Sequence, residues 1–323
     1  MYLIFFLFIV LYSHAQTDEI NFEKVSILSS KHWLDVDYVG DGIIAHRMDI
    51  HLPVKGKGPF PVVVIVYGSA WFSNSSKANV FKEGLGQQLL MNGFAVVSIN
   101  HRSSRDSIFP AQIQDVKASI RFIRANSSKF NLDISFIGIT GWSSGGHLAS
   151  LAGTTNGINT HSIHEMAMNI EGSLGKYTTT SSKVNAVVDW FGPTDFLMMD
   201  KCGSSFSHDD QKSPESSLIG GKIQDNPDRC ALANPITYVR GNDKEQIPPF
   251  LILHGDKDPL VPACESEKLY EALQVRGIRS ELIIVPGGAH GPGVMINTYY
   301  ERMIRFFKNE LKVSLKSNSK NLK

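Results

Sequence analysis

The sequence predicts an α/β fold built on a mostly parallel, doubly wound sheet with helices on both faces. Short runs of β-branched and aromatic residues, such as 61–66 and 94–99, have the length and composition of buried strands. Helix-like segments alternate with them, and this alternation requires crossover helices that cover both faces of a parallel sheet. A glycine-rich turn at 141–145 joins one such strand directly to a helix. Loop insertions interrupt the alternation and are expected above the strand ends.

The elements follow a simple order along the chain. The leading strand alternates polar and apolar residues over 46–52. Isoleucine and valine recur at helical spacing and predict a helix over 111–126 with one apolar side that faces the core. The other apolar runs predict strands at 61–66, 94–99, 136–140, 184–190, 248–254 and 281–285.

The turn at 141–145 has the sequence Gly-Trp-Ser-Ser-Gly and precedes a helix-like run at 146–152. A serine on such a turn is held in a strained backbone conformation with its hydroxyl exposed. Glycines two positions before and after it allow strand and helix to approach closely. The pattern is typical of a nucleophile elbow with Ser143 as the nucleophile, and an ordinary glycine-rich turn is the alternative.

An acid and a histidine follow this turn in the chain. The strand at 248–254 leads into a loop that carries Asp256 and Asp258, and the strand at 281–285 leads into a loop that contains His290. The order nucleophile, acid, histidine is that of α/β-hydrolases. A serine hydroxyl needs an imidazole to take its proton and a carboxylate to orient that imidazole. The sequence therefore predicts a catalytic triad.

Three segments carry a family resemblance: 109–117, 139–149 and 254–258. They resemble the esterase/lipase-type α/β-hydrolases of bacteria, and most of all the bifunctional feruloyl and acetyl-xylan esterase group. The resemblance runs from roughly Asp37 to Leu311. It implies the α/β-hydrolase fold and hydrolysis of a carboxylic ester.

The resemblance also implies the roles of the triad residues. Ser143 would be the nucleophile, Asp258 the acid and His290 the base. Asp258 is favoured over Asp256 because the acid of the family lies three residues after the glycine at the strand end, here Gly255. Asp256 is then expected to be a turn residue, as aspartate commonly is in such loops.

The oxyanion loop departs from the family pattern. In these esterases it usually has the sequence His-Gly-Gly-Gly-Trp, whereas 67–71 of this chain has Tyr-Gly-Ser-Ala-Trp. The donors are backbone N–H groups, so the hole survives the substitutions if neither changed position needs a positive φ. We expect the N–H groups of Ser69, Ala70 and Ser144 to be the donors, because the residue after the nucleophile offers one in every such elbow.

Two stretches, 154–183 and 194–246, break the alternation of strands and helices and are expected to shape the substrate pocket. Trp71, Trp142 and Trp190 follow or end predicted strands and are candidate substrate-binding residues that would stack on a sugar or phenolic ring. Packing in the core or the elbow is the alternative for Trp142 and Trp190.

The ends of the chain differ in composition from its body. Residues 1–15 contain an apolar core and close on a small residue, Ala15, which resembles a signal peptide, with an uncleaved anchor as the alternative. We expect a catalytic domain over 16–311 and a disordered basic tail over 312–323. The expected location is secreted or periplasmic, with no stable membrane partner after removal of the signal.

Charge and cysteine content bear on the partners, the disulfide and the metal sites that the chain can have. A net charge of +1 argues against nucleic acid or an acidic polymer as a partner. Three cysteines cannot all pair, and Cys202 with Cys230 is the expected bridge because both lie in the irregular region, whereas Cys264 begins a predicted helix. The spacing of cysteine and histidine indicates no zinc site, so neither a metal nor a cofactor is expected. The sequence leaves the oligomeric state open.

The predicted function is serine-dependent ester hydrolysis through an acyl-enzyme. The resemblance implies that the substrate is a small-molecule or polysaccharide ester, with acetyl groups on xylan or another plant polysaccharide first and feruloyl groups second. The alternative enzyme is a peptidase or an arylformamidase on the same fold. Outside catalysis, the alternative is a non-catalytic carbohydrate-binding relative, which the altered 67–71 loop suggests.

Overall fold

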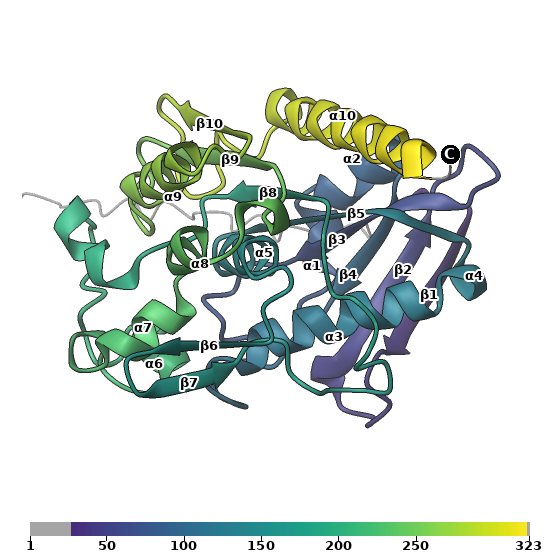
Figure 1. Ribbon diagram of the computed structural model, residues 1–323. Coiled ribbons are helices and arrows are strands. Elements are labelled where there is room, and N and C mark those ends of the chain that lie inside the picture. The colour runs from purple at the N-terminus through teal and green to yellow at the C-terminus, as the bar shows by residue number, and fades with distance from the viewer. Residues whose placement is uncertain (1–26, 322–323) are drawn as a thin grey trace, which may run out of the picture.

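The computed structural model describes residues 27–321. The central feature of this part of the chain is a twisted sheet of eight strands (Figure 1). The strand order is β1-β2-β4-β3-β5-β8-β9-β10. β2 is antiparallel to both of its neighbours, and every pair from β4 to β10 is parallel. The sheet strands are β1 Lys31–Asp37, β2 Arg47–Leu52, β3 Phe60–Val66, β4 Ala95–Ile99, β5 Leu132–Trp142, β8 Ala186–Trp190, β9 Phe250–Gly255 and β10 Ser280–Val285.

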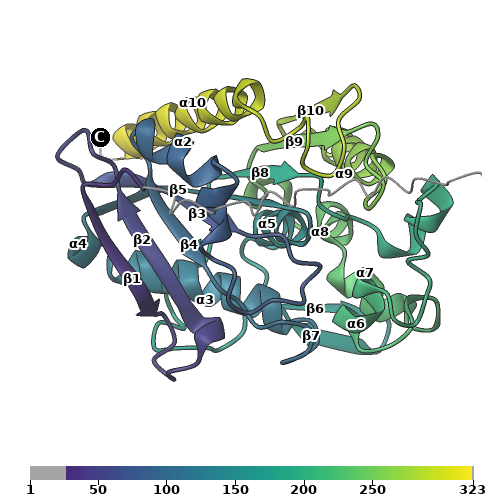
Figure 2. The same ribbon diagram turned by 180° about the vertical axis from the view of Figure 1, so that it is seen from behind.

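Helices cover both faces of this sheet, as the sequence predicted. One core lies between the sheet and α3, α5, α8 and α9, and the other lies between the sheet and α1, α2 and α10. Figures 1 and 2 show α2 and α10 on one side of the sheet and α3 and α5 on the other. The helices are α1 Asn79–Lys82, α2 Leu85–Met91, α3 Ala111–Ala125, α4 Ser127–Phe130, α5 Ser144–Thr154, α6 Pro214–Ile219, α7 Pro227–Ala233, α8 Pro235–Gly241, α9 Cys264–Val275 and α10 Asn297–Asn321.

The parallel register brings the ends of five strands to one edge of the sheet. Val66 pairs with Gly141, and Trp142 pairs with Trp190, so β3, β5 and β8 end together. Gly255 pairs with Val285, which aligns the ends of β9 and β10. The loops that follow these strands contain the predicted oxyanion residues, the nucleophile, the acid and the histidine.

Some elements differ from the sequence predictions. β1 was not predicted, because this edge strand is largely exposed and lacks an apolar run. α10 continues to Asn321, so the expected disordered tail over 312–323 is helical as far as the structure describes it. The predicted signal peptide at 1–15 lies outside the described residues.

The described residues contain no helix with the length and apolar character needed to cross a membrane.

The two insertions have different places in the fold. The first forms a hairpin of β6 (Thr160–Ile163) and β7 (Met166–Asn169), which lies beside α6 and α7 in both views. It is tied to α3, because Glu171 forms ion pairs with Lys117 and Arg121. The second insertion carries α6, α7 and α8 and reaches the end of the sheet where the triad residues lie.

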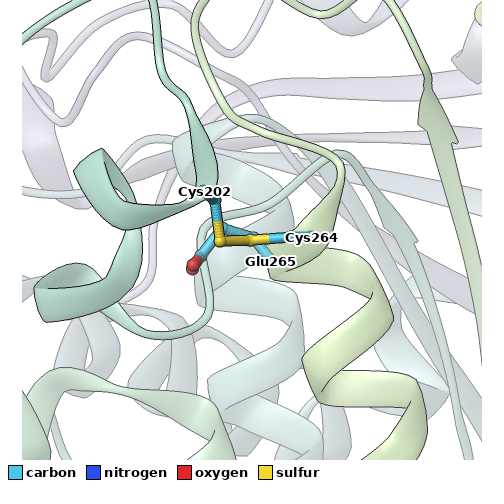
Figure 3. A group of neighbouring side chains, drawn as sticks. All are labelled: Cys202, Cys264 and Glu265. Atoms are coloured by element: carbon cyan, nitrogen blue, oxygen red, sulfur yellow. A yellow bond between two sulfur atoms is a disulfide. The ribbon is translucent and has the colours of Figure 1, made fainter.

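The predicted bridge between Cys202 and Cys230 is wrong. Cys202, in a 3-10 turn at Asp200–Cys202, pairs with Cys264 at the start of α9 over a Cα–Cα distance of 6.2 Å (Figure 3). Cys230 points into the core from α7 and is fully buried as a free thiol. Burial raises its pKa to about 12, which keeps the thiol protonated. Folding, rather than nearness in sequence, therefore selects the partner.

Glu265 lies directly beside the disulfide, as Figure 3 shows. The three side chains Cys202, Cys264 and Glu265 place their ligand atoms within 4.8 Å of one another. The two sulfurs are bonded to each other and are not thiolates, and one oxygen of Glu265 accepts the N–H groups of Thr194 and Asp195. The cluster therefore serves as a covalent and hydrogen-bonded link between the second insertion and α9.

Candidate active site

Ser143 lies on a strained turn between β5 and α5. Its φ is 55° and its ψ is −127°, a conformation that costs on the order of 1–3 kcal/mol for a residue with a side chain. The turn is tied down at both sides, since the Ser143 N–H donates to Trp190 O at 2.9 Å and the His147 N–H donates to Ser143 O at 3.0 Å. This is the geometry of the predicted nucleophile elbow.

Two glycines make the turn possible. A Cβ on Gly141 would lie 2.3 Å from Gly145 O, and a Cβ on Gly145 would lie 2.2 Å from Val66 O. Both distances are far inside van der Waals contact, so only glycine allows β3, β5 and α5 to meet here. The spacing of the motif therefore follows from the close approach of backbone to backbone.

Asp258 and His290 meet on neighbouring loops. His290 Nδ1 lies 2.7 Å from Asp258 Oδ2, and the carboxylate is fully buried while the imidazole is 16% exposed. The other oxygen, Oδ1, accepts the N–H groups of Leu260 and Val261 at 2.8 and 3.0 Å. Burial alone would raise the pKa of Asp258, but hydrogen bonds from His254, His290 and Val261 and the nearby His290 hold it well below its usual range. Asp258 therefore stays ionised and orients His290.

Asp256 has the structural place that the sequence suggested. Its Oδ1 accepts the N–H of Gly287 at 2.6 Å, and its own N–H donates to Val285 O at 3.1 Å. These bonds link the loop after β9 to the loop after β10. Asp256 thus holds the two loops together and does not contact His290.

His254 is a residue of the site that sequence reasoning missed. It is the penultimate residue of β9 and has no exposed surface, and its Nε2 lies 2.9 Å from Val261 O and 3.4 Å from Asp258 Oδ2. Its Nδ1 lies 2.7 Å from Ser266 Oγ in α9. The i,i+4 spacing of His254 and Asp258 across the strand end is the signal that was available.

The loop after β3 alters the predicted oxyanion hole. Ser69 was expected to be a donor, but its N–H donates to Ser144 Oγ at 2.8 Å and is therefore occupied. Within the described chain, the N–H groups of Ala70 and Ser144 donate to no other group. Ala70 has a φ of 51° and Trp71 a φ of 57°, so the loop does use the positive φ that glycine normally supplies. Ala70 and Ser144 therefore remain as candidate oxyanion donors. The prediction for Ser69 is corrected, because its N–H forms a bond that anchors the loop.

Ser143 and His290 lie where two clefts meet. We call the first the Trp71 cleft; it has a volume of about 500 Å³ and is lined by Trp71, Phe206, His208, Glu215 and Val261 among others. The second, the Trp142 cleft, has a volume of about 620 Å³ and is lined by Gly68, Trp142, Phe191, Pro292, Met295 and Ile296 among others. Both clefts share Ala70, Ser143, Leu260 and His290.

No hydrogen bond joins the Ser143 hydroxyl to the His290 ring among the described contacts, and such bonds often tighten only when substrate binds. The junction of the two clefts has room for an ester bond with one group on each side. The arrangement fits attack on an acyl carbon that lies between the clefts.

The three candidate tryptophans have different positions. Trp71 and Trp142 each line one cleft, with 1% and 9% of their surface exposed. Trp190 is wrong as a substrate-binding residue, because it has no exposed surface and its Nε1 donates to Thr140 Oγ1 at 3.1 Å. It packs on Tyr300 of α10, with a ring separation of 5.6 Å. This is the core packing that the sequence left as the alternative.

The second insertion shapes the site, and the first does not. Residues 206–215 line the Trp71 cleft, whereas no residue of 154–183 lines either of the two clefts. His208 and Glu215 were not predicted, since no spacing pattern distinguishes them from surface residues of a loop.

Comparison with known proteins decides the family. The family model BD-FAE matches residues 48–273, which is more than half of the chain and includes Ser143 and Asp258. The chain belongs to the BD-FAE family. This result confirms the resemblance seen in the sequence, together with the α/β-hydrolase fold.

Two solved structures of carbohydrate esterases show the same architecture. A truncated carbohydrate esterase from gut microbiota is 46% identical, with a TM-score of 0.84 over 88% of this chain and 98% of that one. A bifunctional GH43-CE protein of Bacteroides eggerthii is 50% identical, with a TM-score of 0.82 over 88% of this chain and 36% of that one.

Curated relatives are named as esterases. Esterase LipC of Mycobacterium tuberculosis is 30% identical over 251 residues, which cover 74% of this chain and 54% of LipC. The chain spans about half the length of the curated relatives it matches. BD-FAE membership and these neighbours place the chain among α/β-hydrolase esterases.

Proposed function

We propose that this protein is a secreted serine esterase that removes acetyl groups from xylan or another plant polysaccharide, with feruloyl esters as the second substrate. The observation that carries the proposal is the convergence of Ser143 and the Asp258–His290 pair at the junction of two clefts. Similarity to solved carbohydrate esterases at 46% and 50% identity supports a sugar ester as the substrate.

The proposed reaction begins with the Ser143 hydroxyl. Its oxygen attacks the acyl carbon while His290 Nε2 takes its proton, and the ionised Asp258 stabilises the imidazolium through Nδ1. The negative oxygen of the tetrahedral intermediate accepts hydrogen bonds from the N–H groups of Ala70 and Ser144. The C–O bond to the alcohol then breaks, and His290 returns the proton to the leaving oxygen.

The second half of the reaction releases the acyl group. A water molecule gives a proton to His290 and attacks the acyl-enzyme, and the acid and the free Ser143 hydroxyl are formed. The same two N–H donors serve both tetrahedral intermediates. The ordered Asp258–His290 pair supports catalysis over the non-catalytic alternative.

Secretion has separate support. The Cys202–Cys264 disulfide is of a kind that persists in oxidising compartments such as the periplasm or the extracellular space. The apolar segment within 1–15 supports the same location.

A panel of esters tests the proposed function. Wild type and Ser143→Ala would be assayed with p-nitrophenyl acetate, butyrate and octanoate, with acetylated xylo-oligosaccharides and with methyl ferulate. We expect the wild-type protein, but not Ser143→Ala, to hydrolyse p-nitrophenyl acetate and the acetylated xylo-oligosaccharides. The kcat/KM for the p-nitrophenyl esters should decline as the acyl chain becomes longer. The proposal would be contradicted if the wild-type protein hydrolysed none of these esters, or if Ser143→Ala kept full activity.

A further inference from the structure

A buried ion pair faces the Trp71 cleft. His208 and Glu215 are only 6% and 3% exposed, and His208 Nδ1 lies 3.1 Å from Glu215 Oε2. Both line the cleft that Ser143 and His290 also line. Because even paired charges are costly to bury, the presence of this pair beside the cleft calls for an explanation.

The cleft around this pair combines apolar side chains with polar ones, which include the charged residues Asp210 and Lys212. Trp71, Phe206, Leu260 and Val261 supply the apolar side chains, and Phe206 is 56% exposed. An apolar lining with a few fixed polar groups is typical of a site that orients a ligand by hydrogen bonds. The flat apolar face of a sugar ring suits such a lining, while its hydroxyls need polar partners.

The surrounding loop fixes the position of His208. Its Nε2 lies 2.9 Å from Ser204 Oγ, and its backbone N–H donates to Asp200 Oδ1 at 2.7 Å. Asp200 lies in the 3-10 turn that the disulfide joins to α9. Burial alone would lower the pKa of His208. The hydrogen bond with Glu215 and the negative charges of Glu215 and Asp200 outweigh this effect and raise the pKa. The contact with Glu215 therefore favours the protonated imidazole, and the imidazole holds the carboxylate in place.

Glu215 has one oxygen left over. Oε2 faces His208, whereas Oε1 has no hydrogen bond to any residue of the described chain. Glu215 lies in the first turn of α6, and the N-cap residue of this helix, Ser213, accepts the N–H of Ser216 through its Oγ. A carboxylate oxygen without a protein partner, in the cleft that Ser143 also lines, is an acceptor for a hydroxyl group that enters this cleft.

We propose that Glu215 binds a hydroxyl group of the sugar in a carbohydrate ester, and that His208 positions Glu215 for this contact. The proposal rests on the proposed function and deepens it. It assigns the sugar to the Trp71 cleft, and consequently the acyl group to the Trp142 cleft on the other side of Ser143.

The test compares two esters that share the acetyl group. Acetylated xylobiose presents sugar hydroxyls, and p-nitrophenyl acetate presents none. The readout is the ratio of kcat/KM for the sugar ester to that for p-nitrophenyl acetate, because the folded fraction of each variant cancels from it. Glu215→Gln should lower this ratio ten- to hundredfold, mainly through the KM of the sugar ester, since it replaces a charged acceptor by a neutral one.

Two further variants sharpen the comparison. His208→Gln should lower the same ratio to a smaller extent, again through KM, because the carboxylate stays but loses its positioning partner. Glu245→Gln is the matched control, since its side chain is 77% exposed and lines neither cleft, and it should leave the ratio unchanged.

The possible results separate this inference from the proposed function. A Glu215→Gln protein that loses both activities in equal proportion has an unchanged ratio and overturns the inference, because the pair would then be structural. Wild type that cleaves only p-nitrophenyl acetate overturns the sugar contact but leaves a serine esterase. Turnover that survives in Ser143→Ala would instead contradict the proposed function.

Discussion

The N–H group of Ser69 donates a hydrogen bond to Ser144 Oγ at 2.8 Å and so joins the loop after β3 to the first turn of α5. The side chain of Ser144 thus anchors the loop, while its backbone N–H donates to no other group of the described chain and is available to the proposed oxyanion. This bond explains how a loop with serine and alanine in place of glycines stays in position.

The anchoring bond can be tested with two serine-to-alanine changes. Ser144→Ala removes the acceptor and should lower kcat about five- to tenfold, because a neutral hydrogen bond contributes on the order of 1 kcal/mol. Ser69→Ala keeps the N–H and should change kcat less than about twofold by the same estimate. Steady-state kinetics with p-nitrophenyl acetate measures both. A large loss in Ser69→Ala alone would mean that its hydroxyl acts in the hole.

Ala70 combines a needed N–H with an unfavourable backbone conformation. Ala70→Pro deletes the donor and cannot adopt the φ of 51°, so kcat should fall at least 10² to 10³-fold, as for loss of one oxyanion donor. Ala70→Gly keeps the N–H donor. It should relieve roughly 1–2 kcal/mol of backbone strain, and the greater conformational entropy of glycine in the unfolded chain offsets part of this gain. Kinetics, with far-UV circular dichroism and a thermal melt to check folding, distinguishes the two variants. Equal kinetic losses in both would contradict a backbone donor at this position.

The two carboxylates of the loop after β9 should differ sharply. Asp258→Asn changes the partner of His290 and favours the wrong tautomer, so kcat should fall by roughly 10⁴. Asp256→Asn retains an oxygen that can accept the Gly287 N–H, so we expect a loss below about tenfold. Both proteins would be checked for folding by thermal melts. The opposite ranking would show that the acid is misassigned.

Glu265 makes stability depend on pH. Burial raises its pKa to about 8, although N–H groups of Asp195 and Thr194 act in the other direction. The unfolded carboxyl loses its proton near 4.5, so the folded state binds more protons between about pH 4.5 and 8 and the free energy of unfolding falls as pH rises through this window.

Glu265→Gln removes this titration and keeps an oxygen acceptor. The Tm of the variant relative to wild type should therefore rise by several degrees between pH 5 and pH 8. Asp189, whose pKa burial raises to about 6, titrates in both proteins and cancels from the difference. Glu267→Gln, an exposed position on the same helix, is the control. A Tm difference that does not change with pH would refute the role given to Glu265.

The sequence predicted the sheet and the turn at Ser143 because their causes are local. Apolar runs such as 61–66 form buried strands, and Gly141 is required by the backbone of Gly145, four residues later in the chain. The chain order and the family spacing were enough to indicate Asp258 and His290, which the fold then brings within 2.7 Å.

The wrong predictions concern contacts that only folding creates. Cys264 pairs with Cys202 because α9 begins beside the second insertion, and nothing in the spacing of the cysteines shows this. Trp190 ends a strand near the site, but its side chain faces the core under α10. The Ser69 N–H was expected in the oxyanion hole, yet it donates to the hydroxyl of Ser144 in the first turn of α5. The His208–Glu215 pair depends in the same way on the path of an irregular insertion.

The central claim is that Ser143 and His290 act as one catalytic unit. The most direct test is the kcat for p-nitrophenyl acetate of Ser143→Ala, His290→Ala and the double variant. Each single change should lower kcat by roughly 10⁴ to 10⁶, and the double variant should be little worse than either, because members of a triad are not additive. Losses that add in the double variant, or wild-type turnover in folded Ser143→Ala, would contradict the claim.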